Sequence, residues 1–196
     1  MEQIQYIFNH LELFYAIGGA LAFIIIVLIL RSSKRPKLLP ELIPYSMHYK
    51  NVRSVLSDED WKEVARISYK NSNHRCDICG ARGRMECHEI WDFNDKKLVQ
   101  KLVGLTTLCH ECHQVKHIGL ARKLGWFGDA LEHMSKINGI SINKCKKYIE
   151  YAEMEVKKRR EEYDLDLTFL NSYKNILPRK YTKRENDNCR QIKGNW

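Results

Sequence analysis

The chain has 196 residues and a formal net charge of +9, and its mean hydropathy of -0.48 is that of a polar protein. This length accommodates one modest globular domain with extensions, and the polar average excludes a protein that crosses a membrane many times. The basic excess is concentrated beside an N-terminal apolar segment and in the C-terminal tail. Anionic lipid explains such charge as well as nucleic acid does, so charge alone does not establish a DNA partner.

The first element is an apolar segment without charges, LFYAIGGALAFIIIVLIL at residues 13–30. As a helix it would be about 27 Å long, close to the hydrocarbon thickness of a bilayer, so it predicts a single transmembrane helix. A cleaved signal peptide and a buried core helix are the alternatives, but the segment lacks a basic N-terminal flank and a small-residue cleavage site. Arg31, Lys34, Arg35 and Lys37 follow it. The positive-inside rule then predicts a single-pass protein of the inner (cytoplasmic) membrane, with the rest of the chain in the cytoplasm.

The chain after this segment divides into four regions. Residues 31–50 contain three of the four prolines and predict an extended basic tether. Residues 51–125 predict the main domain, in which Ser57 caps a first helix and an alternating run from Met85 forms a strand. Residues 126–177 predict a helical extension, with Gly139 ending one helix and Ser141 starting the next. The polar tail, residues 178–196, lacks periodicity and is expected to be disordered.

Four of the seven cysteines form two C-x-x-C pairs. These are Cys76, Cys79, Cys109 and Cys112, and the two pairs can place four thiolates around one tetrahedral ion. In a reducing compartment such cysteines are metal ligands or thiols rather than disulfides. The spacing therefore predicts a structural Zn²⁺ site, with a redox C-x-x-C pair as the alternative.

Three histidines beside these cysteines indicate a second, open metal site. A helix that starts at the second pair carries His113 and His117 one turn apart on one face. In the strand MECHEI, alternation puts Glu86 and His88 on one face, and Glu89 stands beside His88 at the expected strand end. Three imidazoles would leave coordination positions open for phosphate and water, which is the mark of a catalytic metal.

The order C-x-x-C-G, MECHEIW, C-x-x-C-H and K-H resembles the HNH endonuclease family over about residues 50–125. The resemblance implies a ββα-metal fold that clamps one divalent ion, Mg²⁺ or another, between a hairpin and a helix and hydrolyses phosphodiester bonds. It implies that His88, His113 and His117 hold this ion. Glu89 stands where the family has its histidine base. An alignment shifted by one residue would instead make His88 the base and Cys87 a ligand, so both residues remain candidates for the base.

The expected fold class is therefore α+β, with a single transmembrane helix followed by a small ββα-metal HNH domain with helical flanks. The expected function is a membrane-anchored endonuclease acting on DNA, and the anchor suggests phage defence or superinfection exclusion as its setting. A non-catalytic zinc protein that binds nucleic acid and a membrane-tethered interaction protein are the alternatives. Basic side chains expected to contact the nucleic-acid backbone are Arg82, Arg84, Lys116, Arg122 and Lys123.

Overall fold

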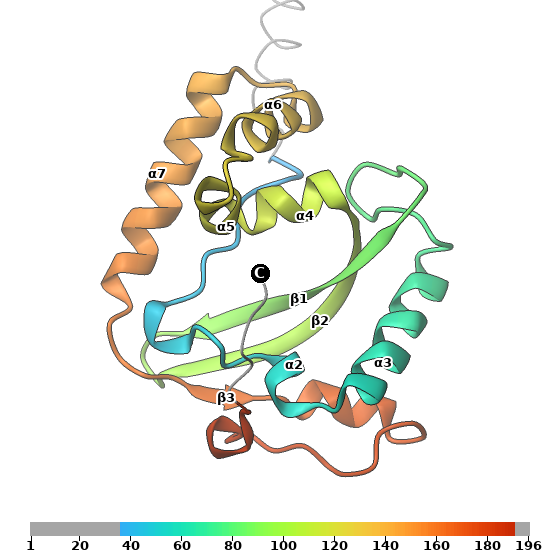
Figure 1. The fold of residues 1–196 in the computed structure, drawn as a ribbon. Coiled ribbons are helices and arrows are strands. Elements are labelled where there is room, and N and C mark those ends of the chain that lie inside the picture. Colours follow the sequence, from blue (N-terminus) through green and yellow to red (C-terminus); the bar gives the residue numbers. More distant parts are fainter. Residues whose placement is uncertain (1–35, 191–196) are drawn as a thin grey trace, which may run out of the picture. The chain divides into compact units, whose positions relative to one another are not determined.

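A long antiparallel hairpin organises the fold (Figure 1). The computed structural model describes residues 36–190. Within them, β1 (Met85–Asn94) pairs with β2 (Val99–Cys109), and the short strand β3 (Asp164–Asp166) pairs in parallel with β2, giving the order β1-β2-β3. The register places Met85 opposite Cys109, so the end of β2 lies beside the start of β1.

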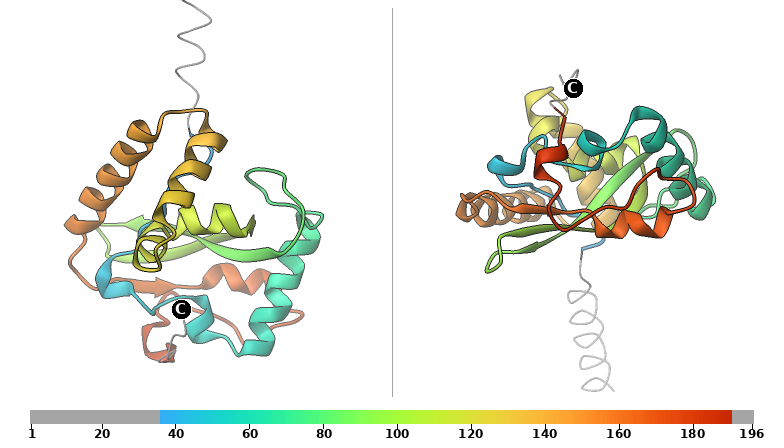
Figure 2. Two further views of the ribbon diagram at one scale, coloured as in Figure 1. Left: turned by 45° about the horizontal axis from the view of Figure 1, so that its top comes forward. Right: turned by 90° about the horizontal axis from the view of Figure 1, so that it is seen from below.

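Helices precede and follow the hairpin. Before it come the 3₁₀ segment η1 (Tyr45–Met47), α2 (Val52–Val55) and α3 (Asp58–Asn71). After it come α4 (His110–Lys116), α5 (Ile118–Lys123), α6 (Phe127–Asn138) and α7 (Ile142–Lys158). The 3₁₀ segments η2 (Thr168–Tyr173) and η3 (Asn186–Asn188) follow β3. Helices α4 to α7 and the segment after β3 lie on opposite sides of the hairpin (Figure 2).

The helix boundaries follow the predicted capping residues. The hydroxyl of Ser57 accepts a hydrogen bond from the backbone N–H of Asp60 at 3.0 Å, which starts α3. The hydroxyl of Ser141 accepts one from the N–H of Lys144 and starts α7. Gly139 ends α6 with a φ of 63°, a left-handed conformation that glycine adopts without steric cost. These predicted caps are confirmed.

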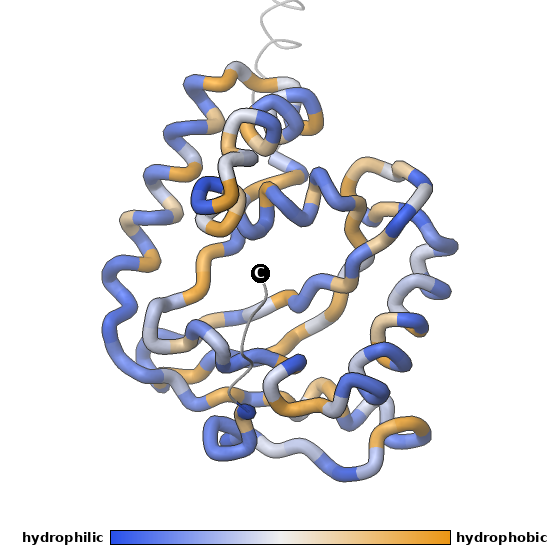
Figure 3. Tube along the Cα trace, in the orientation of Figure 1, coloured by the Kyte–Doolittle hydropathy of each residue, from blue (hydrophilic) through white to orange (hydrophobic). Residues whose placement is uncertain are grey.

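Two clusters of buried apolar side chains hold the chain together. The first packs α4 to α7 against the cysteine end of the hairpin and includes Leu108, Ile118 and Met134. The second lies between the sheet and the segment after β3 and includes Leu102 and Leu165. Apolar positions recur along α7 between hydrophilic ones, as expected for a helix with one buried face (Figure 3).

The predicted membrane topology is corrected. No helix within residues 36–190 is long and apolar enough to cross a membrane. The longest of these helices, α7, has 17 residues and carries several charges, whereas a span needs about 20 apolar residues. The predicted transmembrane segment, residues 13–30, lies outside the described residues. The predicted fold class with a transmembrane helix is therefore replaced by an α+β fold around a three-stranded sheet. The predicted single-pass location in the inner membrane is not supported by the described residues.

Three further regions differ from their prediction. The predicted extended tether, residues 31–50, packs into the domain over its described part, where Leu38 and Met47 are buried and η1 forms. The predicted helical extension, residues 126–177, also contains β3 and the 3₁₀ segment η2, because the chain after α7 turns back and adds to the sheet. The predicted disordered tail packs against the domain through residue 190, with the side chains of Tyr181 and Glu185 buried. The polar composition of the tail gave no sign of these contacts. The Glu185 carboxylate can be buried because it forms an ion pair with Arg179.

Candidate metal centres

The first cysteine pair lies in a tight backbone turn. The N–H of Gly80 donates to the carbonyl of Cys76 at 2.8 Å, and Gly80 has a φ of 74°. Asp77 fastens this turn to β2, because its carboxylate accepts hydrogen bonds from the hydroxyl of Thr106 at 2.8 Å and the N–H of Thr107 at 2.7 Å. The turn is thereby held beside Cys109, the last residue of β2.

The four cysteines of the two pairs come together as the spacing predicted. The sulfur atoms of Cys76, Cys79, Cys109 and Cys112 lie within 4.8 Å of one another, and those of Cys79 and Cys109 are 3.6 Å apart. A tetrahedral ion with four Zn–S bonds of about 2.3 Å separates its sulfur ligands by about 3.8 Å. The cluster is therefore compatible with a zinc site.

These thiols can all ionise only if a cation binds between them. Burial raises the pKa of Cys109 to about 12. Burial and the neighbouring thiolates of Cys76 and Cys109 raise the pKa of Cys112 as well. Four thiolates cannot be held this close without a positive charge between them, and Zn²⁺ supplies that charge in structural sites.

His133 of α6 is a contact that the sequence did not indicate. Its Nε2 lies 3.2 Å from the sulfur of Cys112. An N–H donor at this position stabilises a metal-bound thiolate and fixes its orientation. His133 is separated from the cysteine by 21 positions, so no local spacing could have paired the two residues.

The three predicted histidines converge at a second cluster. One ring nitrogen from each of His88, His113 and His117 lies within 4.8 Å of the other two. The ring centroids are 4.5 to 5.2 Å apart and the rings are steeply inclined to one another. His88 comes from β1, His113 from α4, and His117 from the junction of α4 and α5. No fourth Cys, Asp or Glu of the described residues belongs to this cluster.

The environment favours neutral imidazoles. Burial lowers the pKa of His88, which is 5% exposed. Burial, together with the charges of His113 and His88, lowers the pKa of His117 to about 3. A neutral imidazole presents the lone pair that a metal ion binds, so the donor chemistry fits a divalent ion.

Glu86 orients one of these histidines. Its carboxylate lies against Nδ1 of His113 and also 2.8 Å from Nδ1 of His110. The hydrogen bond with His113 is the largest influence on the pKa of Glu86 and, with that of His110, lowers it to about 2. An ionised carboxylate on Nδ1 leaves Nε2 of His113 as the nitrogen with a free lone pair. His110 itself does not join the histidine cluster.

Glu89 and Cys87 are not brought to the histidines. The strand continues past the expected end to Asn94, so Glu89 points to the face opposite His88. Its carboxylate accepts a hydrogen bond from the N–H of Val52 at 2.9 Å, at the start of α2. Although part of the side chain reaches solvent, desolvation of the carboxylate raises the pKa of Glu89 to about 7. Cys87 is likewise absent from the histidine cluster.

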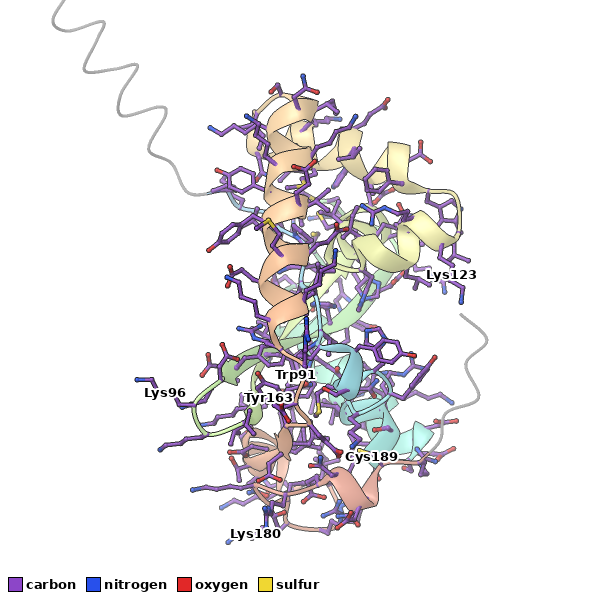
Figure 4. The ribbon with its side chains drawn as sticks, turned by 90° about the vertical axis from the view of Figure 1, so that its left-hand side faces the viewer. Trp91, Lys96, Lys123, Tyr163, Lys180 and Cys189 are labelled. Carbon is purple, nitrogen blue, oxygen red and sulfur yellow. The ribbon has the colours of Figure 1, made fainter. Side chains whose placement is uncertain are left out.

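The basic residues expected at a nucleic-acid surface differ in availability. Arg82 and Arg84 are exposed, and Lys123 projects from the surface near the end of α5 (Figure 4). Arg122 forms an ion pair with Glu153 at 2.6 Å, and Lys116 lies 3.4 Å from the carboxylate of Glu41. The two arginines and Lys123 are therefore freer to meet a phosphate than the other two.

Comparisons of the chain with protein-family models, with curated proteins and with solved structures find no match.

Proposed function

We propose that the protein is a metal-dependent endonuclease of the HNH type that hydrolyses phosphodiester bonds of DNA. The observation that carries the proposal is the convergence of His88, His113 and His117 beside a separate four-cysteine cluster. Four thiolates complete a tetrahedral ion and leave no open position, whereas three imidazoles leave positions for substrate and water. One closed and one open centre are the arrangement expected of a folded metal-dependent hydrolase.

The three imidazoles would hold a divalent ion, and imidazole suits transition ions better than Mg²⁺. Such an ion would supply Lewis-acid chemistry that offsets the negative charge of the scissile phosphate and of the leaving 3′ oxygen. The residues around it would orient the site and bind the substrate. Glu86 holds the ring of His113, and exposed Arg82, Arg84 and Lys123 would meet backbone phosphates without reading sequence.

The attacking water needs a proton acceptor, and Glu89 is the leading candidate. A carboxyl group with a pKa near 7 is matched to proton transfer at neutral pH. His88 is less suited, because a nitrogen that binds a metal ion cannot also accept the proton. Glu89 faces α2, on the side of β1 opposite His88, so it can act on this water only if its hydrogen bond to α2 breaks and its carboxylate turns toward the ion.

A zinc protein that binds nucleic acid without cutting it is the second candidate. The hydrogen bond between Glu89 and the backbone of α2 favours it, because that contact occupies a lone pair of the presumed base. The defence setting considered above depended on a membrane anchor and is not part of the proposal.

The test is cleavage by the zinc-loaded full chain of supercoiled plasmid, single-stranded DNA and RNA with Mg²⁺, Mn²⁺ or Ni²⁺. His113→Ala and His117→Ala should each abolish cleavage and retain one zinc ion per chain. His48→Ala is the matched control, because His48 is exposed and contacts Tyr45 and Tyr49 rather than the cluster. If the wild-type chain binds DNA and cuts no substrate with any of these ions, the protein is a zinc protein that binds nucleic acid without cutting it.

A further inference from the structure

The segment of residues 37–43, here called the strap, crosses α6, α4 and β1 in turn (Figure 1). Leu38 is fully buried, and its N–H and carbonyl both bond the side-chain amide of Asn138, at 3.0 and 2.7 Å. Three residues later, the N–H of Glu41 donates to the carbonyl of Lys116 at 3.0 Å. The strap is thus held at Leu38, against α6, and at Glu41, against α4.

Glu41 directs its carboxylate at His88. Oε2 lies 3.1 Å from Nε2 of His88, and Oε1 accepts a hydrogen bond from the N–H of Trp91 at 3.1 Å. The ammonium group of Lys116 lies 3.4 Å from Oε2. The side chain is only 17% exposed, and these donors compensate a negative charge that would otherwise be costly to bury.

This contact favours one of the two neutral tautomers of His88. A carboxylate accepts hydrogen bonds and cannot donate them, so it favours the neutral tautomer with the proton on Nε2. The lone pair then resides on Nδ1, and the ring cannot rotate without breaking the contact. Glu86 does the equivalent for His113 with the nitrogens exchanged, so two histidines of the cluster each contact a different carboxylate.

We propose that Glu41 is a positioning residue of the histidine metal centre, fixing the tautomer and ring orientation of His88 from a segment 47 positions away in the chain. The inference rests on the proposed function in that it takes the three histidines to bind a divalent ion. Glu41 is not itself one of the ligands, because its oxygens do not belong to the group of atoms that lie within 4.8 Å of one another.

The first experiment titrates Ni²⁺ into the zinc-loaded full chain by calorimetry. Outer carboxylates on metal-binding histidines contribute about 10- to 100-fold in metal affinity, and Glu41→Gln should weaken Ni²⁺ binding by that factor. Glu41→Asp should recover part of the loss because it restores the charge. Glu155→Gln is the matched control and should not change the affinity, since Glu155 pairs with Lys158 on α7. Zinc content and the thermal unfolding midpoint establish that each variant is folded.

The second experiment needs no added ion. Nitrogen-15 NMR of the histidine side chains should show His88 with its proton on Nε2 in the wild type and a mixture of tautomers in Glu41→Gln. A wild-type ring with its proton on Nδ1 overturns the inference, even where Glu41→Gln does not fold.

The outcomes separate the inference from the proposed function. If the wild type binds Ni²⁺ and Glu41→Gln binds it equally well, Glu41 has no positioning role and the nuclease proposal stands. If the wild type binds no ion beyond zinc, the histidine centre is wrong and the role of Glu41 falls with it.

Discussion

The sulfur of Cys79 lies 3.6 Å from the sulfur of Cys109, although thirty positions separate the two residues. Cys79 sits in the turn before β1, and Cys109 ends β2 and caps α4. An ion at this point therefore fastens the open end of the hairpin to the helix that carries His113. The cysteine cluster therefore helps to position His113 of the histidine cluster.

The first prediction concerns this coupling. Cys112→Ala should release the zinc ion and unfold α4 together with the first apolar cluster, because metal binding and folding are linked. Zinc release followed with a chromogenic chelator and helicity followed by circular dichroism measure the effect. Cys189→Ala, outside the cluster, should keep one zinc ion per chain. A Cys112→Ala chain with full helicity and bound zinc would contradict the assignment.

The second prediction concerns the base. Glu89→Gln should retain zinc and the second ion but cut DNA about 10²- to 10⁴-fold more slowly, the range typical of losing a general base. Single-turnover cleavage with saturating metal measures the rate. Glu89→His should recover part of the activity, because it restores the arrangement typical of the family. Cleavage by Glu89→Gln at the wild-type rate would exclude Glu89 as the base.

The third prediction concerns pH. Burial alone raises the pKa of Glu185, but hydrogen bonds from Arg179, Thr182 and Asn188 outweigh it and lower the pKa to about 2. Since the folded pKa lies below the ordinary value of 4.5, this carboxylate stabilises the fold above pH 4.5. The contribution is lost as the pH falls from 4.5 toward 2.

Glu185→Gln should therefore lower the free energy of unfolding by about 2 kcal/mol at pH 7 and by progressively less below pH 4.5. Urea unfolding of both proteins between pH 3 and 7 measures the difference. Zinc loss in acid affects the two proteins alike, so the difference isolates Glu185. A gap that stays constant across this range would mean that Glu185 is not ionised in the folded protein.

The fourth prediction concerns the tail. Tyr181 is buried in the second apolar cluster, so Tyr181→Ala should lower the free energy of unfolding by about 3 kcal/mol. Lys180 projects into solvent beside it, and Lys180→Ala should leave stability unchanged (Figure 4). Equal stability of the two variants would mean that residues 178–190 do not pack against the domain and are disordered, as their composition predicts.

Local spacing accounts for much of what could be predicted. The C-x-x-C turns, the caps at Ser57 and Ser141, and the four-residue separation of His113 and His117 all depend on backbone geometry within one turn. Strand alternation likewise placed Glu86 and His88 on one face. These local features depend little on the rest of the fold, so the cysteines and histidines of both clusters could be predicted from the sequence.

Only the tertiary structure decided which groups surround those ligands. Glu41 reaches His88 across 47 positions, and His133 reaches Cys112 across 21. Glu89 faces away from the cluster because β1 continues to Asn94, and that length follows from its pairing with β2 rather than from its own residues. Contacts between distant segments depend on how the elements pack, and packing energy has no local pattern in the sequence.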